Sequence, residues 1–464
     1  MPHEAWRCYH TDLENAVKLT GGICLNHTDS QPRPGPRIIP RSEHNISRAN
    51  ISENALKVLY RLKNAGFSAF LVGGGVRDLL LDRRPKDFDI VTDAHPERVR
   101  KLFRYCRLIG RRFRLAHVRF GREVIEVATF RATITDEHKD RAHTETGRII
   151  RDNVYGTIGE DVWRRDFTAN ALYYNIADFT IWDYCSGVND IENGVLRLIG
   201  DPVTRYREDP VRMLRAVRLA AKLDLAIAPD AEAPISDLGR LLLEVPAARL
   251  YDELLKLFHA GHAVRSFDLL AHYDLFRYLV PAVDKCNQER SSEDAFKLIR
   301  EGLHNTDERV RANRPVTPAF LYAVFLWHPV LVLADKLGKE GWSEAQAVID
   351  ASSEIISEQQ NTVSVPRRFG KPMKDIFLMQ RRFMNRRGVR AARLLHHKSF
   401  RASYDFLLVR SKVGEVDREI ADWWTNVQRL TLQDQQKAFF IEGRRRMRGN
   451  RSRSRSGQAS QPEK

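Results

Sequence analysis

The sequence predicts an α+β protein, in which a head with a mixed sheet is followed by an elongated, all-helical region. Two observations lead to this prediction. Between residues 69 and 130, short apolar runs typical of strands alternate with helical patterns, as in a mixed sheet with covering helices. From residue 160 to about 440, helical periodicity dominates, and strand patterns are confined to short stretches near residues 172–183 and 195–199.

Shifts in composition place the domain boundaries within a chain of 464 residues, which is expected to hold about two to four domains. Residues 1–40 are polar and end in a proline-rich run, so a disordered N-terminal extension is expected. The head follows at 41–200, a helical neck at 201–285, and a helical body with an arginine-rich C-terminal domain at 286–443. Residues 444–464 hold seven arginines and almost no large apolar residue, which predicts a disordered basic tail.

The elements of the head follow from local patterns. An amphipathic helix is expected over residues 52–65, where leucines recur at helical spacing and Gly66 is placed to stop it. A short apolar strand over residues 69–72 comes next, followed by three glycines and a helix from Val76. The polar stretch 132–150 is expected to be a flexible loop. Three further strands are expected before this loop, at 87–91, 115–120 and 124–130.

Charge and cysteine usage limit the classes of function. Lysine and arginine number 76 against 60 acidic residues, giving a net charge of +16, which favours a polyanionic partner: nucleic acid first, an acidic membrane surface second. The five cysteines form no Cys-x-x-Cys pair, so neither a disulfide framework nor a zinc ribbon is supported, and a reducing cytoplasm is expected. No apolar signal segment opens the chain. Residues 318–334 are apolar but interrupted by His328-Pro329, which predicts two buried helices rather than a membrane span.

The residues that carry chemistry are concentrated near the first strand of the head. Gly73–Gly75 stand between a strand and a helix, where glycines let backbone amides approach an anion, although a tight turn uses glycines in the same way. Twelve residues later, Asp87 and Asp89 are expected to project from one side of a strand. At roughly 6.6 Å, two such charges repel by about 2.5 kcal/mol at an effective dielectric of 20. Mg²⁺ or Mn²⁺ would relieve this repulsion; a solvated pair capping a loop is the alternative.

A third carboxylate, Glu126, lies in the middle of an apolar strand, where an unpaired charge is costly. It is expected either to face the same metal site or to pair with an arginine such as Arg119 or Arg131. A glycine-rich phosphate cradle, paired aspartates and a third acid together fit two-metal nucleotidyl transfer. One ion would activate an attacking hydroxyl, and the other would hold the triphosphate and neutralise the pyrophosphate leaving group.

Two later segments have the character of nucleotide readers. Arg164–Thr168 is expected on a helix, and Glu208–Arg218 begins a helix at Asp209-Pro210. In the second segment, Arg212, Arg215 and Arg218 recur every three residues. By pattern alone, a solvated charged face explains both segments more readily.

Taken together, the motifs resemble those of the bacterial class II nucleotidyltransferases, a family that contains tRNA CCA-adding enzymes and bacterial poly(A) polymerases. They occur in the family's order and spacing, at Phe70–Asp78, Lys86–Ala94, Ile125–Arg131, Arg164–Thr168 and Glu208–Arg218. A closer similarity to the poly(A) polymerase branch covers about residues 38–455. Its further motifs are His44–Arg48, Arg111–Val118, Arg205–Leu214, Pro318–Leu321 and Trp423-Trp424. The first 35 residues do not obviously match.

The resemblance implies roles for individual residues. Asp87 and Asp89 match the metal-binding catalytic acids. Glu126, by its strand position, and Asp166, by its Arg-Arg-Asp motif, are both candidates for a third essential carboxylate, and the sequence does not say which of them touches metal. The triphosphate is expected at Gly74, Gly75 and Arg77. The incoming base is expected at Arg165, Asp209 and Arg212.

The resemblance also implies an activity: template-independent addition of poly(A) tails to RNA 3′ ends in RNA processing or decay, with ATP as substrate, Mg²⁺ or Mn²⁺ as cofactor and pyrophosphate as product. Residues 367–412 hold ten arginines and four lysines against two acids, which suits binding of an RNA backbone without sequence readout. Proteins of RNA degradation and RNA chaperones are candidate partners. The alternatives are a tRNA CCA-adding enzyme and a non-catalytic RNA-binding protein.

Overall fold

The computed structural model describes residues 35–110, 114–132, 154–287 and 292–440. Its residues divide into two compact units, of which the first contains the chain up to Val245 together with Asp268–Tyr278. The second contains Pro246–Phe267 and the chain from Leu279 onward. The predicted loop lies outside the described residues except at residue 132, as do the predicted tail and most of the predicted N-terminal extension. The five-segment division of the chain stays a prediction.

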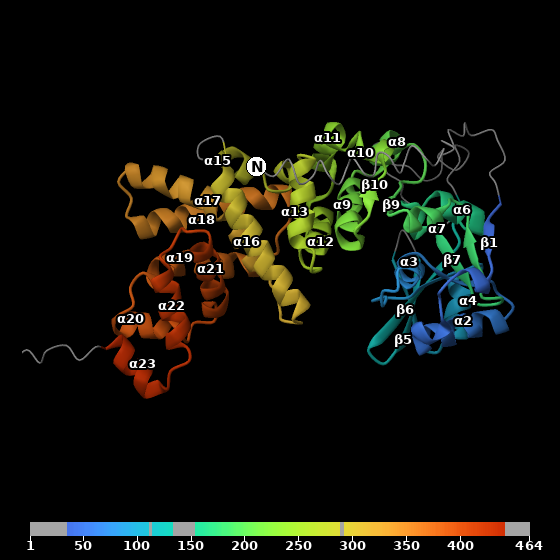
Figure 1. Ribbon diagram of the computed structural model, residues 1–464, viewed down its shortest axis with the longest axis horizontal. Coiled ribbons are helices and arrows are strands. Elements are labelled where there is room, and N and C mark those ends of the chain that lie inside the picture. The colour runs from blue at the N-terminus through green and yellow to red at the C-terminus, as the bar shows by residue number, and fades with distance from the viewer. Residues whose placement is uncertain (1–34, 111–113, 133–153, 288–291, 441–464) are drawn as a thin grey trace, which may run out of the picture. The chain divides into compact units, whose positions relative to one another are not determined.

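A mixed sheet of eight strands is the centre of the first unit, as Figure 1 shows in blue and green. The strand order is β1-β8-β7-β2-β3-β6-β5-β4, and all neighbours are antiparallel except β3 and β6, which are parallel. The strands are β1 (Arg37–Ile39), β2 (Ala69–Val72), β3 (Asp89–Thr92), β4 (Cys106–Ile109), β5 (Leu115–Phe120), β6 (Glu123–Thr129), β7 (Leu172–Asn175) and β8 (Ile181–Asp183). A separate parallel pair is formed by β9 (Val195–Leu196) and β10 (Ala226–Ile227). The mixed-sheet head predicted from the sequence is therefore confirmed.

Helices border this sheet. The first, α2 (Glu53–Asn64), begins where the Ser52 hydroxyl accepts a hydrogen bond from the amide of Ala55, and it is followed by Gly66 at a φ of 85°. The other helices of the unit are α3 (Gly74–Leu80), α4 (Pro96–Leu102), α6 (Ile158–Trp163), α7 (Gly187–Glu192), α8 (Pro202–Glu208), α9 (Val211–Leu223), α10 (Pro229–Glu232) and α11 (Ile235–Leu238). Short 3₁₀ helices are η1 (Arg41–Glu43), η2 (Arg48–Asn50), η3 (Thr168–Asn170) and η4 (Gly239–Glu244).

The two faces of the sheet carry separate apolar clusters. On one face, residues such as Leu71 and Ile90 pack with residues of α2 and α4, including Leu59. On the other face, Phe70 and Tyr173 pack in a smaller cluster with residues of α6. Because side chains alternate along a strand, polar residues that alternate with members of the larger cluster lie on that second face.

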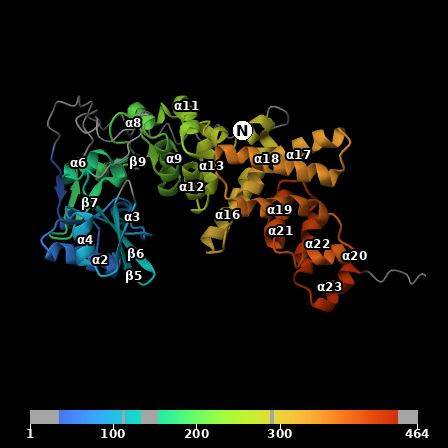
Figure 2. The ribbon, with the colours of Figure 1, turned by 180° about the vertical axis from the view of Figure 1, so that it is seen from behind.

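The second unit is built from helices, as the sequence predicts. α13 (Ala263–His272) and α14 (Phe276–Leu279) fall at the division between the units. The helices that follow or precede them are α12 (Ala247–Phe258), α15 (Pro281–Asn287), α16 (Ser292–Arg311), α17 (Pro318–Lys339), α18 (Glu344–Thr362), α19 (Gly370–Phe383), α20 (Gly388–Leu394), α21 (Phe400–Lys412), α22 (Arg418–Val427) and α23 (Leu432–Phe439), with η5 (Arg367–Phe369) before α19. Figure 2 shows α17, α18 and α19 side by side, in agreement with their contacts.

One helix of the second unit corrects the sequence analysis. Two buried helices separated at His328-Pro329 were expected, but α17 runs unbroken through Pro329. Among the described helices, α17 alone is long and apolar enough to cross a membrane, and 72% of its most apolar stretch is buried inside the protein. Its side chains are packed among neighbouring helices, which favours a core helix. This packing offsets the backbone hydrogen bond that a proline removes.

Local boundaries around the predicted site also differ from expectation. β3 begins at Asp89, so Asp87 precedes the strand and is not part of it. The Arg164–Thr168 segment was expected on a helix, but α6 ends at Trp163. The segment continues as a turn in which Phe167 pairs with Leu198 by an isolated strand bridge. Residues 37–39, which the sequence analysis placed in a disordered extension, form β1 at the edge of the sheet.

Candidate active site

Three carboxylates come together on the face of the sheet that carries the smaller cluster. Strands β3 and β6 run parallel, with Ile90 opposite Val127. One residue earlier on each strand, Asp89 and Glu126 are therefore neighbours, and their side chains point to the same face. Asp87, just before β3, lies close enough for its charge to act on Asp89. The register between neighbouring strands, rather than the pleat of one, brings these acids together.

The ionisation of Asp89 is perturbed by this arrangement. Asp89 keeps access to solvent, yet partial burial, then the charges of Glu126 and Asp87, raise the pKa of Asp89 to about 6. Arg165 acts in the opposite direction. These acids disfavour each other's ionisation, and a bound cation would relieve that repulsion. They offer carboxylate oxygens, the ligands that Mg²⁺ and Mn²⁺ prefer. The donor chemistry therefore fits a hard divalent cation, although the described residues contain no preformed group of three metal-ligating side chains.

Glu126 is the most open of the possible third acids. Its side chain is 46% exposed, and its Oε1 lies 3.4 Å from Nε2 of His117, the residue opposite it on β5. The sequence leaves open a pairing of Glu126 with an arginine; the neighbour that the structure places beside Glu126 is the His117 ring. A partly exposed carboxylate with one histidine neighbour retains free lone pairs for a further ligand.

The glycine turn lies directly beside these acids. At Gly73, φ is 70° and ψ is −129°, a conformation that residues with a side chain rarely adopt, and a Cβ there would meet Nη1 of Arg165 at 3.5 Å. A Cβ at Gly75 would lie 3.6 Å from the backbone oxygen of Asp87. The turn therefore passes close to both the aspartate pair and Arg165, which places the strand, the turn and the acids in one site.

The Arg165 side chain is held in place by hydrogen bonds to two buried groups. Its Nε donates to the Tyr173 hydroxyl at 2.8 Å, and its Nη2 donates to Oδ2 of Asp161 at 3.0 Å. The Tyr173 hydroxyl also donates to that Asp161 oxygen, at 2.9 Å. Burial alone would lower the pKa of Arg165, but Tyr173 and Asp161 hold it above its ordinary value. Arg165 is therefore a fixed, permanent positive charge at the edge of the three acids.

A second layer of polar contacts connects the glycine turn to helix α9. Arg77 donates through Nε to Asp78 at 2.9 Å and through Nη1 to the side-chain oxygen of Asn170. Asn170 in turn donates to Oδ1 of Asp166 at 3.1 Å. Asp166 accepts hydrogen bonds from Nε and Nη2 of Arg215, on α9. These four side chains, Arg77, Asn170, Asp166 and Arg215, form a continuous chain that we call the relay.

Asp166 is committed to this relay. Its side chain is 13% exposed, and burial alone would raise its pKa. Arg215, Asn170 and the Phe167 amide nevertheless hold the pKa of Asp166 below the ordinary value. A carboxylate whose oxygens accept four hydrogen bonds is occupied by the protein itself. Asp166 therefore positions other groups, in contrast to the open Glu126.

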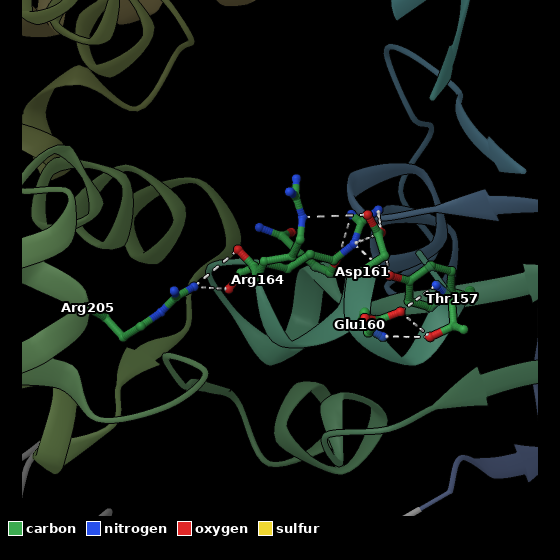
Figure 3. Close-up of polar contacts among 8 residues, drawn as sticks. Thr157, Glu160, Asp161, Arg164 and Arg205 are labelled. Carbon is green, nitrogen blue, oxygen red and sulfur yellow. Dashed lines mark hydrogen bonds and ion pairs between the residues drawn. The ribbon is translucent and has the colours of Figure 1, made fainter. Parts of the chain in front are cut away.

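The junction of α8 and α9 reaches the same region through Arg205, which Figure 3 shows extending to the chain beside Arg164. Arg205 Nη2 donates to the backbone oxygens of Arg164 and Arg165, at 3.2 and 2.6 Å. Arg212 donates to the backbone oxygen of Arg205 at 2.6 Å and to Glu208 at 2.8 Å. The Asp209 carboxylate accepts from the amide of Val211 at 3.2 Å.

The structure thus distributes the predicted residues over three layers. Gly74, Gly75, Asp87, Asp89, Glu126 and Arg165 belong to the innermost layer, Arg77 and Asp166 to the relay, and Asp209 and Arg212 to the α8–α9 junction. Sequence reasoning missed the partners that hold them: Asp161, Asn170, Tyr173 and Arg205. Asp161 and Asn170 stand four residues from Arg165 and Asp166, a spacing that offers a signal in hindsight, whereas Tyr173 is connected only through the fold.

Three family models match the chain. Residues 69–197 match "Poly A polymerase head domain", residues 224–287 match "Probable RNA and SrmB- binding site of polymerase A", and residues 340–458 match "Polymerase A arginine-rich C-terminus". The first of these covers strands β2 to β8 of the sheet, the glycine turn and Asp87, Asp89, Glu126 and Asp166, while the third covers most of the arginine-rich helices of the second unit.

Curated relatives agree with these models. The chain is 48% identical over 417 residues to poly(A) polymerase I of Salmonella typhi, covering 88% of this chain and 89% of the relative. It is 45% identical over 396 residues to poly(A) polymerase I of Haemophilus influenzae, covering 84% and 88%. A CCA-adding enzyme of Lactobacillus helveticus is 37% identical over 215 residues, which cover 46% of this chain and 52% of that enzyme.

Solved structures show the same fold. The Bacillus stearothermophilus CCA-adding enzyme in complex with CTP is 23% identical with a TM-score of 0.53, covering 80% of this chain and 82% of that one. The Thermotoga maritima CCA-adding enzyme complexed with tRNA is 18% identical with a TM-score of 0.56, covering 84% and 85%. The head and the helical region are therefore both built from the elements of the nucleotidyltransferase fold.

Proposed function

The chain belongs to the bacterial poly(A) polymerase I family, and from this premise we propose that Asp87 and Asp89 are the acids of its nucleotidyl transfer, with Glu126 as the third. The protein is a polynucleotide adenylyltransferase that adds poly(A) tails to RNA without a template. In this reaction the RNA 3′-hydroxyl oxygen bonds to the α-phosphorus of ATP and loses its proton. The bond from that phosphorus to the bridging oxygen breaks, and pyrophosphate leaves.

The observation that supports the assignment most directly is the parallel register of β3 and β6, by which Asp89 lies beside Glu126. Burial, then the charges of Glu126 and Asp87, raise the pKa of Asp89 to about 6. A cluster of acids that repel one another is destabilised until a cation joins it. Asp87, Asp89 and Glu126 would hold Mg²⁺, with Mn²⁺ as a substitute, and the bound ions would supply Lewis acidity at the α-phosphate. Glu126 is preferred to Asp166 as the third acid because it is open, whereas Asp166 is ion-paired with Arg215.

The arrangement around the acids supports a binding mode for ATP. Gly74 and Gly75 allow the phosphates close to the backbone, and Arg77 folds back within 3.4 Å of where a Cβ at Gly74 would lie. After its bonds to Asp78 and Asn170, Arg77 retains N–H groups for the triphosphate. The base would be read at the α8–α9 junction and beside Arg165, by Asp209 and Arg212 as acceptor and donor.

RNA is the proposed polymeric substrate, held by the arginine-rich helices of the second unit and joined in the cell by RNA-degradation or RNA-chaperone proteins. The cytoplasm is the compartment we propose. A CCA-adding activity is the alternative specificity, but the sequence match to the CCA-adding enzyme of Lactobacillus helveticus covers 46% of the chain, against 88% for the poly(A) polymerase of Salmonella typhi.

Substitution of the acids tests this assignment with a control on the same strand. Glu126→Gln and Asp89→Asn should each weaken Mn²⁺ binding, followed by electron paramagnetic resonance, and slow adenylation of an RNA primer. Glu123→Gln is the control, because Glu123 also lies on β6 but is engaged by Ser52 and Asn54. Equal Mn²⁺ affinity in all three variants would refute the assignment of these acids to the metal.

A further inference from the structure

A hollow of about 370 Å³ lies in the second unit between α18 and the segment formed by η5 and α19. Six of its lining residues are polar: Ser353, Ser357, Gln360, Arg367, Lys371 and Lys374. Ile356, which is 5% exposed, contributes apolar surface. The hollow belongs wholly to the arginine-rich region and shares no residue with the active site.

Two matching stripes build the hollow. On α18, the hydroxyl and amide side chains recur at positions 353, 357 and 360. On η5 and α19, the cations recur at positions 367, 371 and 374, with the same spacing of four and three residues. Residues with this spacing face one side of a helix. A row of neutral polar groups therefore faces a row of three positive charges.

The positive charges of the hollow are largely uncompensated. Lys374 Nζ donates to the Ser353 hydroxyl at 2.8 Å, which orients it toward the hollow. Within the described residues, Arg367 and Lys371 are exposed and make no side-chain hydrogen bond or ion pair. Of the acids close in sequence to the lining residues, Glu358 is paired with Lys285 and Asp375 accepts a hydrogen bond from Ser399. Glu354, next to Ser353 on α18, is exposed and is not part of the lining. No acid lines the hollow, so its three cations repel one another unless an anion joins them.

The lining indicates which anion fits. Cations and hydroxyl groups are the partners of phosphate oxygens, and a bidentate guanidinium is suited to them. The hollow has no aromatic lining residue on which a base could stack. Because Arg367, Lys371 and Ser357 are exposed, the hollow is open along one side, where a polymer can pass. These features favour a backbone phosphate of a strand over a free nucleotide.

We propose that this hollow binds a phosphodiester group of the RNA strand, as a sequence-independent anchor in a different unit from the site of chemistry. The proposal rests on the RNA substrate proposed above. One phosphate seated among Arg367, Lys371 and Lys374 would hold the RNA while its 3′ end is extended, and would contribute a salt-sensitive share of the affinity.

Lysine acylation of the full-length protein, read by mass spectrometry, tests the site directly. An RNA of about 30 nucleotides offers many backbone phosphates and should protect Lys371 and Lys374. ATP and inorganic phosphate at the same phosphate concentration should not protect them. Lys57, an exposed lysine on α2, should stay reactive throughout. Protection by ATP or phosphate equal to that by RNA would overturn the assignment to a strand, and no protection by RNA would overturn the site.

Salt dependence gives a second measurement. Arg367→Gln with Lys371→Gln should reduce the slope of log binding constant against log salt by about 0.7, the value for the one single-strand phosphate that the protein no longer neutralises. The control, Lys57→Gln with Lys63→Gln on α2, removes the same charge and should leave the slope unchanged. Adenylation at saturating RNA reports the proposed function separately and should persist in both. Equal slopes in the two pairs would overturn the proposal.

Discussion

The ion pair between Asp166 and Arg215 predicts a measurable contribution to the stability of the first unit. Arg215→Met should destabilise the first unit by about 3 kcal/mol, because breaking a buried ion pair leaves an uncompensated charge. We expect the lower end of the usual range, since the Arg215 side chain is 32% exposed and water can approach it. Hydrogen exchange of amides in β7 and α9 under increasing urea measures this unit alone.

The partner substitutions decide what Asp166 does. The double variant Asp166→Asn with Arg215→Met should recover part of the lost stability, because no buried charge then remains unpaired. Asp166→Asn alone should raise KM for ATP through Arg77 and leave Mn²⁺ affinity unchanged. If Arg215→Met were as stable as the unaltered protein, the ion pair at the end of the relay would be wrong. If Asp166→Asn abolished Mn²⁺ binding, Asp166 would be a metal ligand.

Three further predictions concern single positions. Burial lowers the pKa of His259 to about 4, so from about pH 6.5 down to about pH 4 the unfolded chain takes up a proton that the folded chain does not. The free energy of unfolding of the second unit should therefore fall by up to about 3 kcal/mol over this range. In His259→Leu this loss should disappear, so the urea midpoints at about pH 7 and about pH 4.5 should converge. Gly73→Ala should sharply reduce adenylation because of its positive φ and its neighbour Arg165, whereas Gly121→Ala, at a φ of 60° with open space around it, should only lower the melting temperature. Glu415→Ala should lower the melting temperature, because Arg410 would lose its carboxylate partner at 2.8 Å in a partly buried site.

Much of the head could be predicted from local pattern. Residues 69–72 and 115–120 form strands as expected: the first is a short apolar run that ends at a glycine, and the second alternates apolar and polar residues. The grouping of Asp87, Asp89 and Glu126 was also expected, but for an incomplete reason. From the sequence, Asp87 and Asp89 are expected to point the same way because they alternate along one strand. In the structure, the parallel register of β3 and β6 also places Glu126 beside Asp89.

The remainder depends on contacts that no local pattern contains. Asp166 and Arg215 are 49 residues apart, so neither the ion pair nor its effect on the backbone after α6 is visible in the sequence. A helix is expected to continue through Asp166, but α6 ends before this residue, whose side chain accepts hydrogen bonds from Arg215 on α9. Likewise, Pro329 is expected to end a helix, and the packing around α17 carries the helix through it. Tertiary contacts override local preference at these positions.

The central claim is that Asp89 and its neighbouring acids support ATP-specific tailing of RNA. The most direct test is extension of a generic RNA primer with Mg²⁺ and each of the four nucleoside triphosphates separately, by the unaltered protein, Asp89→Asn and the control Glu123→Gln. A long ladder with ATP alone is predicted for the unaltered protein and the control, and a much slower and shorter ladder for Asp89→Asn. Wild-type extension by Asp89→Asn, or CTP-then-ATP addition confined to trimmed tRNA, would contradict the account.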